Sequence, residues 1–278
     1  MTANDQLVRA MLGGGIARVL WVRADHTVAA MAQAHGLRGG AVRLAAELAI
    51  TNVLMSAWIK GEERVGLRLQ ADVPAVTFHG EVDAEGHFRG RFSPAYLRES
   101  VEKIEGLMLA IKSDAKAELY RGITKIEGEP VAVALERHLA TSDQVLAAVR
   151  LQVEDGDQGL HGVGLLLEGL PGCSRGDFQL LCELVDGMGL AEVGDALHTG
   201  RVAVFSSEIV EDRPLVWQCR CSREKVEGIL RGLGADTLRE MICEDAGAEV
   251  GCEFCGTTYI FDEAALAAQI PMGLRGEA

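Results

Sequence analysis

Four cysteines near the end of the chain decide how the C-terminal part folds: Gln218-Cys219-Arg220-Cys221-Ser222 and, after residues 222–251, Cys252-Glu253-Phe254-Cys255-Gly256. A Cys-x-Cys pair and a Cys-x-x-Cys-Gly pair in one short segment are typical of a thiolate metal site. The glycine permits a tight turn that points backbone amides at the sulfurs. Four thiolates at about 2.3 Å from one Zn²⁺ form a closed tetrahedron. We therefore predict that Cys219, Cys221, Cys252 and Cys255 bind one zinc ion.

The segment around these cysteines, residues 217–278, is small. A hydrophobic core is marginal at this size without a covalent or metal crosslink. A structural zinc contributes roughly 10–16 kcal/mol at neutral pH in small zinc domains, as much as or more than the stability of a typical domain. Folding of residues 217–278 should therefore depend on the metal. A site closed by four thiolates has no open coordination position, which disfavours metal-assisted hydrolysis.

The cysteines are also placed where thiolates are favoured. Cys221 directly precedes Ser222, a predicted helix N-cap, and Arg220 and Arg223 add positive charge nearby. On oxidation each close pair can form a local disulfide, which leaves no thiolate for zinc and frees whatever the folded segment holds. The chemistry permits such a switch, but a purely structural zinc is the commonest outcome of this pattern and remains open.

The rest of this segment predicts short helices around one hairpin. Ser222 can cap a first helix carrying Val226, Ile229, Leu230 and Leu233, and Asp236 can cap a second. Strands are expected over 250–252 and 258–261, and Asp262 can start a last helix. Cys243, inside the second helix, is interpreted as an inert residue; the alternative is that it competes in disulfide exchange and changes the oxidised pairing. Cys173 and Cys182 are interpreted as small buried residues.

Residues 1–172 predict an α+β domain of antiparallel strands with helices packed to one side. A long buried helix is expected over Gly40–Ile59, with Arg43, Glu47 and Thr51 forming a narrow polar stripe. Shorter helices are expected over 27–34 and 130–139. Strands are expected over 16–22, 65–70, 75–82, 87–92, 107–111, 118–126, 145–153 and 163–170.

Residues 173–216 are expected to form a helical linker of marginal stability. One helix is predicted over Asp177–Val185, a weaker one ends at Leu197, and Val202–Phe205 could form a strand. Each glycine in a helix costs about 1 kcal/mol relative to alanine, and the segment contains Gly187, Gly189, Gly194 and Gly200. An ordinary surface connection is the alternative interpretation.

Composition excludes some classes of function. The chain has 278 residues and a net charge of −14, which repels nucleic-acid backbones. The first residues lack the basic region and apolar run of a secretion signal, and the stretch 41–59 is interrupted by polar residues, which disfavours a bilayer span. We therefore expect a cytoplasmic protein. The sequence has no P-loop, dinucleotide fingerprint or nucleophile elbow, and its seven histidines are scattered, so we do not expect an enzyme.

Two long stretches around the cysteines, 216–227 and 249–261, resemble the zinc domain of the 33 kDa chaperonin family. The resemblance extends over nearly the whole chain, with similar segments in the same order at residues 5–9, 54–60, 67–70, 120–122, 142–144 and 164–167. The cysteine signature is the specific part of it. The implied organisation is an N-terminal α+β domain over 1–172, a metastable linker over 173–216 and a zinc domain over 217–278.

The resemblance also implies a function, that of an ATP-independent holdase chaperone that is controlled by oxidation. The reduced monomer would hold zinc and be inactive. Peroxide with heat, or hypochlorite, would form two disulfides, Cys219–Cys221 and Cys252–Cys255, release zinc and unfold the linker. The exposed surface would then bind unfolding client proteins, and the active form would be a homodimer.

Two other interpretations share the cysteine pattern. A zinc ribbon that binds nucleic acid needs a basic face, but residues 217–278 carry six basic and eleven acidic residues, a net charge of −5. An adaptor with a structural zinc and no redox response shares every sequence feature of the switch, so it remains open.

Overall fold

The computed structural model describes residues 4–156, 159–199 and 208–271, and it divides the chain into two compact units. Unit 1 is Met1–Gln218 and unit 2 is Cys219–Ala278. The strand expected over 202–205 lies outside the described residues. The described residues of the expected linker, 173–199 and 208–216, supply two helices and two strands to unit 1.

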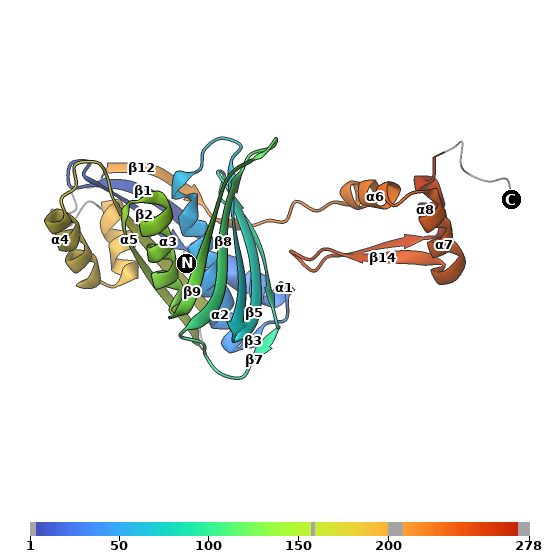
Figure 1. The fold of residues 1–278 in the computed structure, drawn as a ribbon, viewed down its shortest axis with the longest axis horizontal. Coiled ribbons are helices and arrows are strands. Elements are labelled where there is room, and N and C mark those ends of the chain that lie inside the picture. Colours follow the sequence, from blue (N-terminus) through green and yellow to red (C-terminus); the bar gives the residue numbers. More distant parts are fainter. Residues whose placement is uncertain (1–3, 157–158, 200–207, 272–278) are drawn as a thin grey trace. The chain divides into compact units, whose positions relative to one another are not determined.

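Unit 1 is built on two large sheets (Figure 1). The five-stranded sheet has the order β10-β11-β2-β1-β12 and contains β1 (Gln6–Leu12), β2 (Ala17–Arg23), β10 (Leu146–Gly156), β11 (Gly159–Gly169) and β12 (Glu208–Pro214). The six-stranded sheet has the order β13-β6-β5-β4-β8-β9 and contains β4 (Arg64–Val73), β5 (Ala75–Asp83), β6 (His87–Ser93), β8 (Ile104–Ser113), β9 (Glu118–Glu129) and β13 (Val216–Trp217). Neighbouring strands are antiparallel except β13 and β6. The short strands β3 (Arg38–Gly39) and β7 (Tyr96–Leu97) form a separate parallel pair.

Helices cover both faces of the five-stranded sheet. Helix α2 (Gly40–Leu54) contacts strands of both large sheets and lies in the main core with α1 (Asp25–Ala34) and α3 (Val131–His138). Helices α4 (Arg175–Asp186) and α5 (Leu190–Thr199) pack on the opposite face and form a second core. These two helices come from the expected linker, whereas the helices of residues 1–172 for which one side was expected, α1, α2 and α3, share the main core. The apolar run Val163–Leu167 in β11 is buried throughout because this strand is covered on both faces.

Helix α2 is more deeply buried than its polar stripe predicts. Arg43 is exposed and bonds Glu47, whereas Thr51 is fully buried. Burial raises the pKa of Glu47 against the opposing effect of Arg43. By length and composition the helical stretch Gly40–Trp58 could cross a membrane, so the sequence argument against a span was too strict, but 83% of its window is buried within unit 1.

The sheet edge formed by β1 and β12 was not predicted from the sequence. The two strands are antiparallel, with Gln6 opposite Pro214. Polar contacts tie β12 in place: Arg9 pairs with Glu211 at 3.1 Å, and Asp212 accepts from Gln6 at 2.6 Å and lies 3.3 Å from His198 of α5. Because β12 buries little apolar surface, it is held by these polar contacts and by its backbone hydrogen bonds to β1.

Asp5 fixes the start of α1 from outside the helix. Its buried carboxylate accepts the backbone N–H groups of His26 at 2.9 Å and Thr27 at 2.6 Å. We expect Asp5→Ala to lower the free energy of unfolding of unit 1 by about 1–2 kcal/mol, because two helix N-terminal donors lose their acceptor. Urea titration followed by circular dichroism measures this. The exposed Asp72→Ala serves as the control and should leave the midpoint unchanged; equal midpoints for both variants would contradict the prediction.

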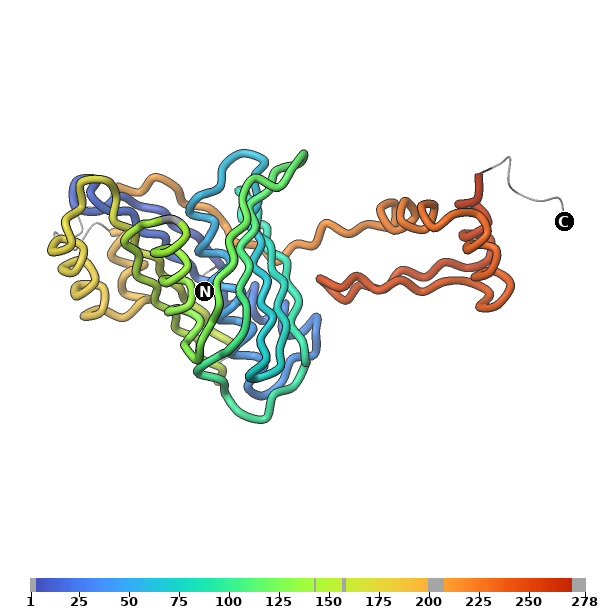
Figure 2. Tube along the Cα trace, viewed as in Figure 1, coloured from blue at the N-terminus to red at the C-terminus, as the bar shows by residue number. Residues whose placement is uncertain are grey.

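In the part of unit 2 that the structure describes, residues 219–271, the chain forms three helices and one hairpin (Figure 2). Its elements are α6 (Arg223–Gly232), α7 (Ala235–Asp245), β14 (Gly247–Gly251), β15 (Thr258–Asp262) and α8 (Glu263–Gln269). Ser222 and Asp262 cap α6 and α8 through their side chains, as predicted. The prediction that Asp236 caps the second helix was wrong: Gly234 is the N-cap of α7, and Asp236 lies in the first turn and pairs with Arg239. Among the described residues of unit 2, six side chains form the buried core: Val226, Leu230, Leu238, Phe261, Leu266 and Ile270.

Candidate metal centre

The first cysteine pair lies on the chain that leads into α6. Ser222 caps the helix by accepting from the Lys225 amide at 3.3 Å, and this fixes Cys221 one residue before the cap. The Lys225 ammonium donates to the carbonyl of Arg220, which holds the residue between the two cysteines. The sequence therefore places Cys219 and Cys221 on a short, anchored segment.

The second pair lies in the connection between β14 and β15. The Gly256 amide donates to the Cys252 carbonyl at 2.8 Å, and the Cys252 amide donates to the Thr257 carbonyl at 2.8 Å. Gly256 has a φ of 71°, a left-handed conformation that glycine adopts without strain. The turn predicted from the Cys-x-x-Cys-Gly pattern is thus present, and it turns Cys252 and Cys255 toward the first pair.

The structure brings all four predicted cysteines together. Their sulfurs lie within 4.8 Å of one another. The Sγ atoms of Cys219 and Cys252 are 3.6 Å apart, and those of Cys221 and Cys255 are 3.4 Å apart. Sulfurs at about 2.3 Å from a central zinc would be separated by about 3.8 Å along each edge of a tetrahedron. The cluster therefore has the size and donor chemistry of a four-thiolate zinc site, and it is the only such group of three or more His, Cys, Asp or Glu side chains found among the described residues.

Two side chains that follow the second cysteine pair in the chain contact the sulfurs. The Tyr259 hydroxyl donates to Cys221 Sγ at 3.1 Å, and Thr257 Oγ1 lies 3.2 Å from Cys255 Sγ. All four cysteines are half-buried. Sequence reasoning missed both contacts, because they depend on the three-dimensional arrangement of the hairpin and not on the spacing of the cysteines.

The pKa values of the cysteine thiols differ within the cluster. Burial raises the pKa of Cys219, and burial also raises the pKa of Cys221 to about 12 despite the hydrogen bond from Tyr259. At Cys255 burial acts in the same direction, but the Thr257 hydroxyl and amide and the neighbouring thiols outweigh it and lower the pKa to about 7. The hydrogen bond to Cys221 raises the pKa of Tyr259 to about 12.

These directions correct one expectation about electrostatics. The helix N-terminus was expected to favour a thiolate at Cys221, but burial beside three other sulfurs has the larger effect. The guanidinium of Arg223 lies over the Phe261 ring, pairs with Glu227 and donates to the Ile260 carbonyl, so it is engaged away from the sulfurs. A bound divalent cation would supply the positive charge that holds four thiolates together.

The remaining cysteines lie outside this cluster. Cys243 is exposed on α7. Cys173 and Cys182 are half-buried, less than expected, and burial raises the pKa of both.

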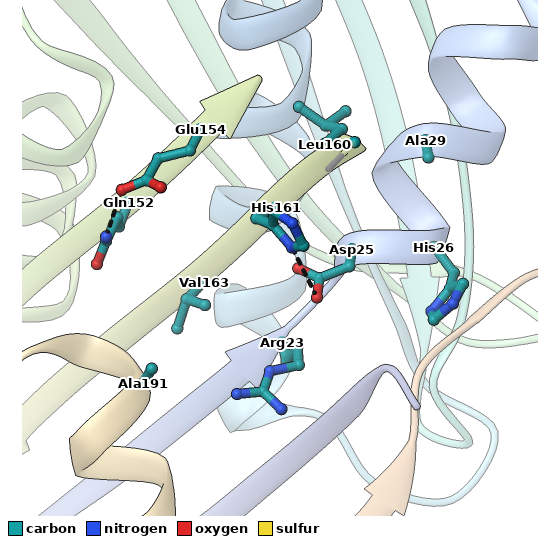
Figure 3. Close-up of a pocket in the computed structure, with 11 residues that line it drawn as sticks. Arg23, Asp25, His26, Ala29, Gln152, Glu154, Leu160, His161, Val163 and Ala191 are labelled. Carbon is teal, nitrogen blue, oxygen red and sulfur yellow. Dashed lines mark hydrogen bonds and ion pairs between the residues drawn. The ribbon is translucent and has the colours of Figure 1, made fainter. Parts of the chain in front are cut away.

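Unit 1 also contains a cavity of about 540 Å³, lined by residues of α1, β2, β10, β11 and α5 (Figure 3). In its lining, Asp25 Oδ2 and His161 Nδ1 lie 3.4 Å apart, and the Asp25 carboxylate also accepts from the Gly162 amide. No serine, threonine or cysteine is among the described lining residues. Ala191 of α5 closes one side of the cavity.

Known proteins of one family match this chain over almost its entire length. The family model described as Hsp33 protein matches residues 5–262. A 33 kDa chaperonin of Lactobacillus delbrueckii subsp. bulgaricus is 31% identical, with 95% of this chain and 97% of the relative aligned. The 33 kDa chaperonin of Syntrophotalea carbinolica is 29% identical, with 93% of this chain and 96% of the relative aligned. The crystal structure of the 33 kDa chaperonin of Thermotoga maritima has the same fold, with a TM-score of 0.82 at 18% identity over 96% of this chain and 98% of that one.

Proposed function

Because the chain belongs to the Hsp33 family of chaperones, we propose that it is a redox-regulated, ATP-independent holdase whose four zinc thiolates act as the switch. The observation that carries the proposal is the convergence of Cys219, Cys221, Cys252 and Cys255 on one point. The four cysteines would bind a metal and would not catalyse a reaction, so no enzymatic activity is expected.

In the reduced protein these four residues would hold one Zn²⁺, and the metal would supply the positive charge that keeps the thiolates together. The buried core formed by the described residues of unit 2 has six side chains, which favours a fold that needs this crosslink. The four ligands complete the coordination sphere, so the metal would be structural until its ligands react.

Oxidation by a peroxide would convert the four thiolates into two disulfides. Each disulfide takes two thiolates and one hydrogen peroxide: a sulfur electron pair breaks the O–O bond, the second thiolate displaces hydroxide from the sulfenic acid, and two hydroxide ions leave in total. We propose the local pairs Cys219–Cys221 and Cys252–Cys255. The short Sγ–Sγ distances between Cys219 and Cys252 and between Cys221 and Cys255 do not oppose this pairing, because all edges of a tetrahedron are alike. After zinc leaves, the cysteines that are nearest along the chain meet most often.

Loss of zinc would then loosen the adjoining segment of unit 1. Strand β13 ends two residues before Cys219, and β12 precedes it on the same chain. Within β12, Asp212 contacts His198 at the end of α5. The segment 173–216 would therefore unfold from its C-terminal end, where polar contacts dominate.

Undocking of α4 and α5 would uncover an apolar face. The two helices cover it with Leu181, Val185, Val193 and Leu197, and the five-stranded sheet contributes Val8, Ala10, Leu12, Val19, Leu165 and Leu167. We propose that this face binds unfolding client proteins. The net charge of −14 would keep a protein with such a face soluble.

We further propose that the reduced form is a monomer, that the oxidised form is a homodimer, and that the protein acts in the cytoplasm without nucleic-acid or membrane partners. The alternatives are an adaptor with a structural zinc that does not respond to oxidants, and a nucleic-acid-binding zinc ribbon. The acidic balance of residues 217–278 disfavours the second.

One experiment separates these functions. The zinc-loaded chain is treated with hydrogen peroxide; released zinc is measured with a chromogenic chelator, and aggregation of a heat-unfolding test protein by light scattering. We expect one zinc per chain to be released and aggregation to be suppressed only after oxidation. Retention of zinc, or release without suppression, would exclude the switch and leave the structural-zinc adaptor.

A further inference from the structure

Tyr259 connects the hairpin of unit 2 to the first cysteine pair. It is the second residue of β15, opposite Val250 of β14, and its half-buried ring packs against the core of unit 2. Its neighbour Ile260 faces solvent and is 68% exposed. The alternation of the strand thus points Tyr259 inward, and its hydroxyl reaches Cys221 Sγ at 3.1 Å.

The hydroxyl contacts divide the four sulfurs into two classes. Cys221 accepts from Tyr259, and Cys255 lies beside Thr257. Among the described residues, no hydroxyl contacts the sulfur of Cys219 or Cys252. Each local pair therefore contains one sulfur with a hydroxyl neighbour and one without, and the two neighbours are different side chains that can be changed separately.

We propose that Tyr259 is a positioning residue that sets the oxidant threshold of the Cys219–Cys221 pair. A hydrogen bond donated to a thiolate draws electron density from the sulfur, so the electron pair that must attack the O–O bond of a peroxide is less available. The same bond holds Cys221 within reach of the metal. This inference rests on the proposed zinc switch and adds a residue that controls when one half of it reacts.

The chemistry on which Tyr259 acts is the first step of oxidation at Cys221. The Cys221 sulfur attacks hydrogen peroxide, gains one oxygen as a sulfenic acid and releases hydroxide; the Cys219 thiolate then attacks this sulfur, forms the disulfide and releases a second hydroxide. Tyr259 is not consumed. Because its bond to the thiolate weakens as the sulfur loses electrons, the bond stabilises the reactant more than the transition state and slows the step.

The test compares Tyr259→Phe with Thr257→Val in the full-length, zinc-loaded chain. Each replacement removes one hydroxyl and keeps the bulk of the side chain. Peroxide oxidation is stopped at intervals by alkylation, and mass spectrometry gives the free-thiol fraction of each cysteine. In Tyr259→Phe we expect Cys221 to oxidise about fivefold faster relative to Cys252 and the zinc Kd, from chelator competition, to rise about tenfold. Thr257→Val should instead accelerate Cys255.

A spectroscopic arm separates electronic from structural effects. With Co²⁺ in place of zinc, the thiolate-to-metal charge-transfer band of Tyr259→Phe should move to lower energy, because the sulfur lone pair is no longer stabilised by a donor. Replacing the three tyrosines of the chain with 3-fluorotyrosine acts in the opposite direction. Because 3-fluorotyrosine is a stronger hydrogen-bond donor, it should slow Cys221 oxidation without removing any group.

The outcomes are distinguishable. If wild-type protein releases zinc on oxidation but Cys221 in Tyr259→Phe reacts at the wild-type rate, the role of Tyr259 is refuted and the switch stands. Equal acceleration of all four cysteines in Tyr259→Phe would show loosened packing and would also refute it. If wild-type protein keeps its zinc under peroxide, the switch fails and this inference fails with it.

Discussion

A chain in which Cys252 and Cys255 are both replaced by serine is expected to lose zinc and the fold of unit 2. Two thiolates cannot close a tetrahedral site, and serine hydroxyls are poor zinc ligands. The zinc contribution, roughly 10–16 kcal/mol in small zinc domains, exceeds what the small core of unit 2 can supply alone. Activation by peroxide and reversal by a thiol reductant should both disappear.

Metal content by mass spectrometry and hydrogen exchange over residues 223–270 measure this effect. We expect less than one-tenth of the wild-type zinc, from the metal affinities of such sites, and rapid exchange throughout unit 2 with unit 1 still protected. The matched control is Cys243→Ser, which changes an exposed thiol outside the cluster and should retain both zinc and protection. A double variant that still carries one zinc per chain would mean that these cysteines are not the ligands.

Gly194→Ala is expected to dislodge α5 from the five-stranded sheet and produce a chaperone that is active while reduced. A Cβ at position 194 would lie 2.9 Å or less from three ring atoms of Trp21. The indole N–H of Trp21 also donates to the Leu190 carbonyl at 2.7 Å, so the helix cannot move away without losing that bond. Overpacking of this kind costs about 1–3 kcal/mol, which is large for a pair of short helices.

Tryptophan fluorescence of the reduced, zinc-loaded protein measures the undocking. Trp21 is 2% exposed, so its emission should shift to longer wavelength when α5 leaves, in a background where Trp58 and Trp217 are phenylalanine. Suppression of aggregation without peroxide should appear in the same variant. Gly189→Ala is the matched control, because a Cβ there meets nothing within 4 Å. A buried Trp21 and an inactive reduced protein in Gly194→Ala would show that α5 does not mask the client-binding face.

Local signals in the sequence predicted those parts of the molecule that depend on neighbours in the chain. The cysteine spacing identified four residues whose sulfurs converge, and Ser222 and Asp262 identified two helix starts. Contacts between distant segments were not predictable in this way. Three such contacts depend on how separately formed elements meet. They are the pairing of β1 with β12, the close packing of Gly194 against Trp21, and the hydrogen bond from Tyr259 to Cys221.

The ladder between β1 and β12 has a consequence for how the chain is made. Gln6 and Asp212, which bond across it, are 206 residues apart in the sequence. Closing a loop of that length costs about 5 kcal/mol of chain entropy, and no residue of β12 exists until most of unit 1 has been synthesised. A nascent chain therefore carries the edge of β1 unpaired for nearly the whole of its translation, with the row of free backbone donors and acceptors that invites strand addition from other chains. A protein proposed to restrain aggregation in others passes through its own aggregation-prone stage on the ribosome.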